Sequence, residues 1–488
     1  MTNRLQFYII TAFAVILAAM YGLCIQDDTF ISFRYAENLV NGNGLVFNPG
    51  EYVEGITNPL WTLLFTGLLM FGIDPVIGAY VMGMLSIGLL MWSTLRLSTA
   101  LKLSWHWVAL LVIALDASVL LEAVEGLESV AFAALTTLAV ALTFEKLKGQ
   151  KELWTTGLLC GIALMMRPEG LGVAGLISIG LLLGDGDRRY KLRAVMSVLI
   201  PVLTVLLLMT VFRILYYDAI LPNTFYAKVG GFQWSRGLTY WVHHALQHPV
   251  LWSAIFVGTF LSVKDSRLRL LSVVAVGYTL YVISVGGDFK PTSRFLIPVV
   301  PLAAVILAQL CHQKLRHYPI LAITVVVVML FSRWNLYQDS LSWAQTRRMN
   351  LLGRKAAGEW FARYTPEDTL MAMHSVGVVP YYAKRPCIDM WGLNDKVIAQ
   401  TPIKPDPNAL IGHQRSNPEY VFSRKPDIYI PEDDWLVLDD LEQPVEDGFP
   451  SDFTDNYISV SIPLGASFMN IWVRKEFARD TFRMNLEG

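Results

Sequence analysis

The chain has 488 residues, of which 54% are hydrophobic and only 16% are charged. Water-soluble domains carry roughly 25% charged residues, so this composition excludes a soluble cytosolic enzyme and a disordered chain. The net charge is -1, and no overall basic field exists to attract nucleic acid.

Stretches of about 20 apolar residues predict helices that cross a bilayer. Eleven such spans are predicted, at 7–25, 75–95, 104–121, 129–144, 153–166, 170–184, 194–216, 249–263, 268–285, 295–310 and 318–331. The first is interpreted as a retained helix, because no small-residue cleavage site separates it from Asp27 and Asp28. The sequence therefore predicts a polytopic α-helical membrane protein, with residues 1–331 as its membrane domain.

The apolar stretch 59–73 is short for a span, and the distribution of charge decides its topology. If it stays outside and the N-terminus is cytoplasmic, the inner loops hold fifteen Lys and Arg residues and the outer loops six. A crossing at 59–73 would invert every later loop and remove this positive-inside bias. We therefore predict a juxtamembrane or re-entrant helix at 59–73, inside an outer loop that covers residues 26–74.

Residues 332–488 differ in composition from the preceding spans. They mix charged and apolar residues, and short β-like runs occur at 369–373, 427–430 and 457–462. A segment of this length can bury a core of its own. Because an odd number of spans from a cytoplasmic start ends outside, the sequence predicts a C-terminal extracytoplasmic α/β domain.

Two adjacent carboxylates, Asp27 and Asp28, follow the first predicted span. One could deprotonate a hydroxyl nucleophile, and the other could orient that nucleophile or bind a divalent cation. Repulsion between the two carboxylates tends to raise one of their pKa values. The alternative is that both residues cap the next helix together with Thr29.

The first outer loop reads DDTFISFRYAENLVNGNGLVFNPGEYVEGITNPLW over residues 27–61. This segment resembles the GT-C glycosyltransferases, and within them the arabinofuranosyltransferase branch with its mycobacterial and pilin-modifying members. Further segments resemble the same branch, namely Gly126-Leu127-Glu128, Arg167-Pro168-Glu169-Gly170, residues 221–228, Gly286-Gly287-Asp288 before Arg294-Phe295, and the YY…IDMWGLND pattern at 381–395.

The resemblance implies an enzyme of the bacterial inner (plasma) membrane. GT-C enzymes take a sugar from a polyprenyl-phosphate carrier on the outer face, and the arabinofuranosyltransferase branch implies D-arabinofuranose as that sugar. The expected acceptor is a polysaccharide, a glycolipid or a pilin, and the expected reaction is an inverting displacement. Asp27 stands where the family has its catalytic base, with Asp28 second, and a divalent cation at this pair stays open. The other partners expected are membrane lipids, with no nucleic acid.

Two alternatives to this function remain open. One is a GT-C transferase of another lipid-linked sugar, such as mannose, glucose or an amino-pentose. The other is a transporter or flippase of a lipid-linked sugar. Transporters commonly contain internal repeats, and we find none in this sequence. Transporters also carry charges at the bilayer midplane, and here Asp116 is the only acid well inside a predicted span.

The leaving group of such a donor is a phosphate, whose charge needs cations or amides. Arg167, Lys228 and Arg294 are candidates at the outer ends of spans, with Asn223 and Thr224 beside Lys228, although Lys and Arg also extend to the interface without a function. The residues expected to line the substrate cavity are Arg34, Tyr35, Glu54, Asn58, Glu128, Glu169, Asp288, His374, Asp389, Asn394 and Asp395, and His413 is a further candidate.

Each of these cavity candidates also has a structural alternative. Glu54 and Asn58 could be turn and cap residues, and the polar residues of the tail could belong to turns and to a satisfied core. Glu122, Glu125 and Glu128 could share one helical face through their i, i+3 spacing, or could be acids at a helix N-terminus.

Overall fold

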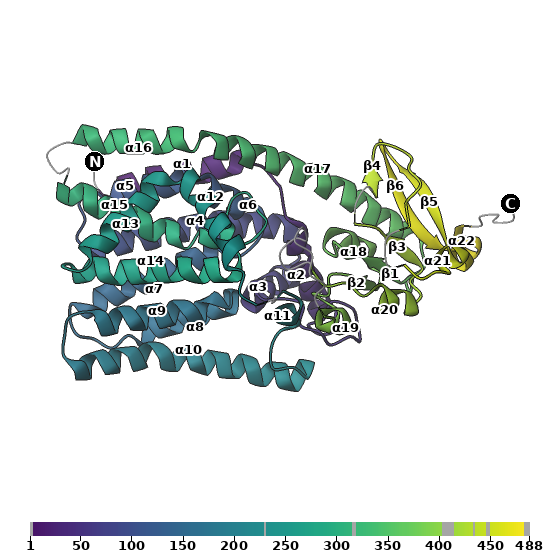
Figure 1. Cartoon of the computed structure of the whole chain (residues 1–488), viewed down its shortest axis with the longest axis horizontal. Coiled ribbons are helices and arrows are strands. Elements are labelled where there is room, and N and C mark those ends of the chain that lie inside the picture. Colours follow the sequence, from purple (N-terminus) through teal and green to yellow (C-terminus); the bar gives the residue numbers. More distant parts are fainter. Residues whose placement is uncertain are drawn as a thin grey trace.

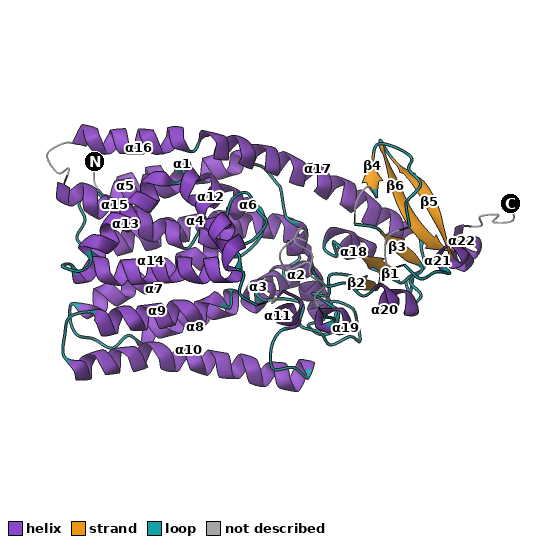
Figure 2. Cartoon of the chain, in the orientation of Figure 1, coloured by secondary structure: helices purple, strands orange, loops and turns teal. Residues whose placement is uncertain are grey.

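The structure is a computed structural model that describes residues 3–228, 231–314, 319–402, 414–432, 435–445 and 449–482. The candidate residue His413 lies outside these described residues. A bundle of apolar helices forms one end of the molecule, and a small α/β domain that contains the strands forms the other (Figure 1; Figure 2).

Thirteen helices make up the bundle. They are α1 (Asn3–Met20), α4 (Pro75–Ala100), α5 (His106–Ala114), α6 (Ala117–Val124), α7 (Ser129–Leu147), α8 (Trp154–Met166), α9 (Glu169–Leu183), α10 (Arg188–Tyr217), α12 (Trp234–Gln247), α13 (Pro249–Leu261), α14 (Ser266–Val285), α15 (Val299–Lys314) and α16 (Pro319–Ser332).

Four of the described helices are long and apolar enough to cross a membrane, namely α4, α7, α10 and α14. If α5 and α6 together form one bent span, the described helices contain five. Several other apolar helices, such as α8 and α9, are shorter. The predicted membrane location fits these helices, whereas the count of eleven spans stays a prediction.

The span predicted at 104–121 contains a sharp bend. The chain forms α5 and α6 there, which meet at an angle of 57°. The break falls at Asp116, whose side chain accepts a hydrogen bond from the Val119 amide and thereby caps α6. Its other oxygen lies 3.2 Å from His248 and 3.2 Å from Arg333, so contacts between helices hold the break in place.

Short helices cover the end of the bundle that faces the α/β domain. They are α2 (Asp27–Val40), α3 (Pro59–Met70), α11 (Asn223–Lys228) and the 3-10 helix η1 (Arg294–Leu296). Figure 1 shows α2, α3 and α11 between the bundle and the domain. At 12 residues, α3 is about 18 Å long, which is too short to cross a bilayer core.

The α/β domain is joined to the bundle by one long helix, α17 (Trp334–Tyr364), which runs from the bundle to the sheet (Figure 1). The sheet contains β1 (Met371–Met373), β2 (Cys387–Asp389), β3 (Ile428–Ile430), β4 (Leu436–Val437), β5 (Tyr457–Leu464) and β6 (Ser467–Arg474). Strand β1 pairs in parallel with β2 and β3, while β6 pairs antiparallel with β3, β4 and β5. The helices of the domain are α18 (Val378–Ala383), α19 (Lys396–Gln400), α20 (Pro418–Ser423), α21 (Phe453–Asn456) and α22 (Lys475–Phe482).

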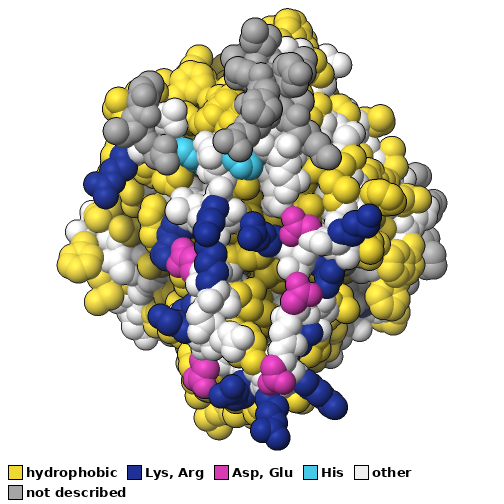
Figure 3. All heavy atoms as spheres, turned by 90° about the vertical axis from the view of Figure 1, so that its left-hand side faces the viewer, with side chains coloured by type: hydrophobic (Ala, Val, Ile, Leu, Met, Phe, Trp, Pro, Cys, Tyr) yellow, Lys and Arg dark blue, Asp and Glu magenta, His cyan; other side chains and the backbone are white. Residues whose placement is uncertain are grey.

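Lys and Arg side chains gather on the end of the bundle that lies opposite the sheet (Figure 3). A basic end opposite the α/β domain is the distribution that the predicted orientation requires, because cytoplasmic loops are rich in Lys and Arg.

Candidate active site at the junction of bundle and domain

Asp27 ties the start of α2 to the α/β domain. Its carboxylate accepts hydrogen bonds from the amides of Gly377 at 2.9 Å and Val378 at 3.1 Å, and it forms an ion pair with Arg354 at 2.9 Å. Gly377 is required for this contact, because a Cβ atom there would lie 1.9 Å from the Asp27 carbonyl oxygen. Both oxygens of the Asp27 carboxylate are therefore engaged in holding two parts of the fold together.

Asp28 faces different surroundings. Gln26 donates a hydrogen bond of 3.3 Å to its carboxylate. Its charge acts on two cations, Lys228 at the end of α11 and Arg294 at the start of η1. Desolvation lowers the pKa of the Lys228 ammonium, and the charge of Asp28 opposes that change. The structure thus brings Asp28 together with two of the predicted phosphate-binding cations.

Lys228 differs from the other two cations in what it contacts. Its side chain is exposed, and no acidic side chain in the described part of the chain forms an ion pair with it. Arg294, in contrast, pairs with Asp288 at 2.5 Å. Beside Lys228, Thr224 is buried and its hydroxyl has no hydrogen-bond partner among the described residues. Lys228 and Thr224 are therefore the groups of α11 that an incoming ligand can engage.

Arg167 is held between two carboxylates. It pairs with Glu128 at 2.8 Å and with Glu169 at 2.9 Å, and its guanidinium lies 5.0 Å from the centre of the Phe295 ring. The second oxygen of Glu128 accepts a hydrogen bond from Asn58 at 2.8 Å. Because its charge is already neutralised, Arg167 organises this network and is the least available of the three cations.

A buried charge cluster that the sequence analysis did not single out lies beside this network. Lys290 donates to Glu122 at 2.8 Å and also to Glu125, and all three side chains are fully buried. Of the two alternatives for Glu122, Glu125 and Glu128, a shared helical face does not occur, because α6 ends at Val124 and the chain turns at Gly126, where φ is +85°. Glu128 instead directly precedes α7. A signal for Lys290 did exist in the sequence, because this lysine lies two residues after the Gly286-Gly287-Asp288 motif.

The cluster also positions α2. The Glu125 carbonyl oxygen accepts hydrogen bonds from the Gln26 amide at 3.0 Å and from the Thr29 hydroxyl at 3.1 Å. The turn that carries Glu125 thus holds the residues on both sides of Asp27 and Asp28, and Lys290 links it to the loop of Arg294.

Arg34 and Tyr35 connect the first outer loop with the domain. The buried Arg34 guanidinium donates to the carbonyl oxygens of Phe47, Pro380 and Arg385, each at 2.7 Å. The Tyr35 hydroxyl donates to Val53 at 2.6 Å and lies 3.1 Å from Asn394. These contacts are made with protein groups, so both side chains act as structural links and do not line an open cavity.

The predicted residues of the tail lie in the same junction. Asp389 accepts hydrogen bonds from the amides of Trp391, Gly392 and Asn394 and from the Asn394 side chain, and its burial raises its pKa to about 6. Asp395 caps α19. The ring of His374 lies 5.6 Å from that of Trp391. Asp389, Asn394 and Asp395 therefore shape a turn of the domain.

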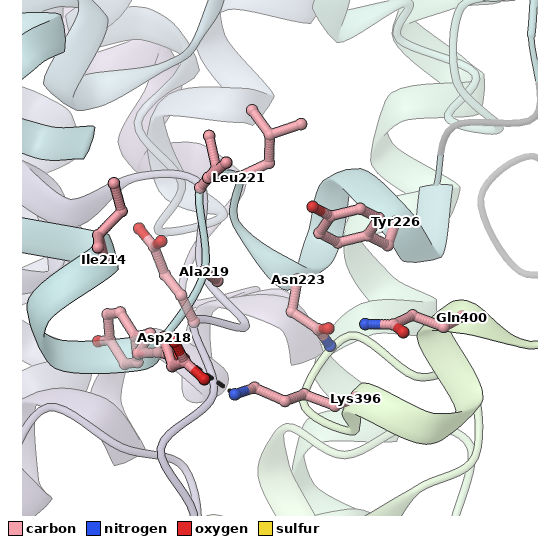
Figure 4. A pocket seen from close by; sticks show the side chains of 11 residues that line it. Ile214, Asp218, Ala219, Leu221, Asn223, Tyr226, Lys396 and Gln400 are labelled. Atoms are coloured by element: carbon pink, nitrogen blue, oxygen red, sulfur yellow. Dashed lines mark hydrogen bonds between the residues drawn. The ribbon is translucent and has the colours of Figure 1, made fainter. Parts of the chain in front are cut away.

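Glu54 and Asn223 lie at a cavity beside this turn (Figure 4). Glu54 pairs with Arg213 at 2.6 Å, and desolvation raises its pKa. Asn223 donates to the carbonyl oxygens of Gly392 at 2.8 Å, Leu393 at 3.0 Å and Asp395 at 3.1 Å.

The donor set at Asp27 and Asp28 does not fit a divalent cation. Such a cation prefers several carboxylate or carbonyl oxygens, whereas both oxygens of Asp27 already face Arg354 and two amides. Among the described residues, no group of three or more His, Cys, Asp and Glu side chains is arranged to hold a metal.

Comparison with known proteins agrees with this architecture. The chain is 28% identical over 330 residues to the terminal β-(1→2)-arabinofuranosyltransferase of Mycobacterium tuberculosis, covering 57% of this chain and 51% of that protein. It is 26% identical over 372 residues to the enzyme of the same name from Corynebacterium glutamicum, covering 64% and 51%. The chain thus spans about half the length of the curated relatives it matches.

The crystal structure of ArnT from Cupriavidus metallidurans bound to undecaprenyl phosphate superposes with a TM-score of 0.57 at 12% identity, and covers 98% of this chain and 99% of that one. The chain therefore shares the fold of ArnT and is similar in sequence to terminal arabinofuranosyltransferases. Residues 338–482 of this arabinofuranosyltransferase-like protein also match a family described as a domain of unknown function (DUF8728). The similarity to ArnT extends over both the bundle and the domain, and concerns the fold.

Proposed function

We propose that the protein transfers D-arabinofuranose from a polyprenyl-phosphate donor to an extracytoplasmic acceptor. The sequence similarity to two arabinofuranosyltransferases supports the sugar, and the fold shared with an undecaprenyl-phosphate-bound protein supports the lipid carrier. The observation that carries the proposal is that the turn of Glu125 holds the residues on both sides of Asp27 and Asp28, while Lys290 ties the same turn to the loop of Arg294. This arrangement holds the carboxylates of α2 near a cation from a distant segment.

In the proposed reaction, Asp28 accepts the proton of the acceptor hydroxyl as the oxygen attacks the anomeric carbon of the donor. A new carbon–oxygen bond forms, the bond from the anomeric carbon to the phosphate oxygen breaks, and the polyprenyl phosphate leaves with the electron pair. Attack from the face opposite the leaving group inverts the anomeric configuration. Lys228 and Arg294 stabilise the phosphate charge as it develops.

The remaining groups support this centre from a distance. Asp27 fixes the start of α2 through Arg354 and the two amides, and this structural role of Asp27 favours Asp28 as the base. This reverses the sequence-based preference for Asp27. Arg167 contributes indirectly, because Glu128 and Glu169 occupy its guanidinium. The Thr224 hydroxyl is a further candidate donor to the phosphate.

A transporter or flippase has less support from the geometry. Asp116 was the acid that the sequence offered for a midplane site, and it pairs with His248 and Arg333 in a cluster that has almost no exposed surface. A charge on a transport path needs access to its cargo, and Asp116 has none in this conformation. The other alternative, transfer of a different lipid-linked sugar, is tested below by comparing donors that carry arabinofuranose, mannose and glucose.

The test is turnover of purified protein in proteoliposomes that contain polyprenyl-phosphate arabinofuranose with a labelled sugar, together with an arabinofuranose oligosaccharide as acceptor. We expect labelled oligosaccharide, and a drop of at least tenfold in kcat/KM for Lys228→Gln. Lys355→Gln is the matched control, because Lys355 is a partly exposed lysine on α17 whose described contacts are an ion pair with Glu359 at 3.8 Å and the ring of Tyr382 at 5.1 Å.

Parallel reactions with polyprenyl-phosphate mannose and glucose test the sugar. Transfer of either hexose in preference to arabinofuranose contradicts the assignment of the donor. Movement of the intact donor across the bilayer without sugar transfer contradicts the assignment of an enzyme.

A further inference from the structure

A cavity of about 450 Å³ lies where the end of α10 and the segment that leads into α11 meet the α/β domain (Figure 4). It is formed where α10 ends, by the segment that leads into α11, by Glu54 of the first outer loop and by α19 of the domain. This volume falls within the range of roughly 300–1,000 Å³ that is typical of small-molecule sites. Three segments that are far apart in the sequence therefore enclose a space large enough for a ligand.

The cavity is lined by many hydrogen-bonding groups. Its polar residues are Glu54, Asp218, Asn223, Lys396 and Gln400, and the ring of Tyr226 forms part of its wall. Figure 4 shows the side chains of Asn223 on α11 and Gln400 on α19 directed toward each other, while Lys396 on α19 extends toward the end of α10. The rest of the wall is formed by a second tyrosine, Tyr217, and by the apolar residues Ile214, Ala219, Ile220 and Leu221. Amides and charged groups beside tyrosines and apolar side chains suit a molecule that carries hydroxyls on a carbon framework.

The charge of the lining argues against a phosphate as the ligand of this cavity. Two carboxylates, Glu54 and Asp218, face one ammonium, that of Lys396. Glu54 is balanced by Arg213 at 2.6 Å, and Lys396 donates 2.9 Å to the Tyr217 carbonyl oxygen. With Glu54 balanced by Arg213, Asp218 and Lys396 remain as one negative and one positive charge, so the lining is close to neutral. A neutral lining offers an anion no net attraction and permits an uncharged ligand.

The walls of the cavity are held together by hydrogen bonds across the junction. The Asn223 amide donates to the Glu54 carbonyl oxygen at 3.0 Å, and the Asn223 side chain donates to three carbonyl oxygens of the turn before α19. Buried polar contacts of this kind fix the relative positions of the groups that a ligand would meet. The cavity is therefore preformed.

Its position relative to the reaction centre follows from the helices that connect them. Asn223 at the cavity and Lys228 at the centre are the two ends of α11, about 7.5 Å apart along the axis. The Tyr35 hydroxyl on α2 accepts a hydrogen bond from the amide of Gly55, the residue after Glu54. Along α2, Tyr35 lies two turns, or about 10 Å, from Asp28. The cavity is thus within reach of a short saccharide whose end meets Asp28.

We propose that this cavity binds the acceptor, through an uncharged saccharide unit adjacent to the one that carries the attacking hydroxyl. The inference rests on the proposed function and names the acceptor class, a neutral hydroxyl-rich glycan. The donor phosphate is bound on the other end of α11, so that the two substrates approach Asp28 from opposite sides. If the acceptor is instead a peptide, an unglycosylated peptide and not an oligosaccharide should compete for this cavity, and the test below distinguishes the two.

The test uses the full-length protein with the double substitution Asp218→Asn and Gln400→Ala. Both side chains are exposed at the cavity, and Asn tolerates the left-handed backbone at residue 218, where φ is +52°. Asp455→Asn is the matched control, because Asp455 is exposed on α21 in the domain and does not line the cavity.

Two quantities are measured. The first is binding of neutral arabinofuranose and mannose oligosaccharides without donor, by saturation-transfer NMR. The second is the partition of labelled donor sugar between water and an arabinofuranose oligosaccharide. For the double variant we expect weaker glycan binding and an acceptor KM at least tenfold higher, with release of sugar to water within twofold of wild type.

The outcomes separate this inference from the proposed function. An unchanged acceptor KM, a raised donor KM, or competition by an unglycosylated peptide but by no oligosaccharide overturns the assignment of the cavity. A wild type that binds oligosaccharide but releases no sugar from any lipid donor overturns the proposed function and leaves the glycan site standing.

Discussion

Adjacent residues Asp27 and Asp28 should respond to the same substitution in opposite ways. Asp27→Asn weakens two charge-assisted hydrogen bonds to Gly377 and Val378, at about 1 kcal/mol each, and removes a partly exposed ion pair with Arg354, at up to about 1 kcal/mol. The attachment of α2 to the domain then weakens by about 2–3 kcal/mol. We expect a lower melting temperature and a moderate loss of rate.

Asp28→Asn removes the proposed base and leaves those contacts in place. General-base catalysis contributes about 10²–10⁴ in rate, which is about 3–5 kcal/mol of transition-state stabilisation. We therefore expect kcat to fall by that factor, with the melting temperature close to that of wild type. The rise of kcat/KM with pH should also disappear, because that rise reports deprotonation of the base.

The assay combines sugar transfer in proteoliposomes with thermal unfolding of the same preparations in detergent. Arg354→Met serves as the partner control, and it should reproduce the effects of Asp27→Asn. If Asp27→Asn abolishes transfer at an unchanged melting temperature while Asp28→Asn stays active, the reasoning from the contacts of Asp27 is refuted.

Three further changes test other parts of the site. Lys290→Met leaves the Glu122 and Glu125 carboxylates buried without a cation, and it should lower the free energy of unfolding by about 3–5 kcal/mol. Adding Glu122→Gln should restore part of this stability in thermal unfolding. A double variant as unstable as Lys290→Met contradicts the role of the cluster. Tyr240→Phe removes the hydroxyl that accepts a hydrogen bond from the Phe295 amide, next to Arg294. Loss of this hydrogen bond, about 0.5–1.5 kcal/mol, should raise the donor KM about two- to tenfold. An equal rise of the acceptor KM contradicts the role of Tyr240 in positioning Arg294 for the donor. Asp389 has a folded pKa of about 6 against 3.8 unfolded, so the folded state binds more protons between these values and loses stability as pH rises through them. Wild type should therefore lose about 3 kcal/mol relative to Asp389→Asn between pH 4 and 7, and a constant difference in melting temperature rules this titration out.

The sequence by itself determined the classes of element, because these depend on local composition. Apolar stretches of sufficient length predict α4, α7, α10 and α14, and the short β-like runs at 369–373, 427–430 and 457–462 predict β1, β3 and β5, each of which the structure contains. The motifs from Asp27 to Trp61 likewise indicated the family without reference to any contact. The strand β6, which pairs with three others, was missed because its sequence mixes polar and aromatic residues.

Only the tertiary structure decided which polar groups are committed and which are available. Asp27 and Asp28 are identical in type and adjacent in sequence, yet the partner of Asp27 is an amide 350 positions away. Lys290 finds Glu122 across 168 positions, and Asp116 breaks a helix that hydropathy predicts as continuous. Pairings of this kind are determined by how helices pack, since a buried charge is stable only beside the groups that packing brings to it.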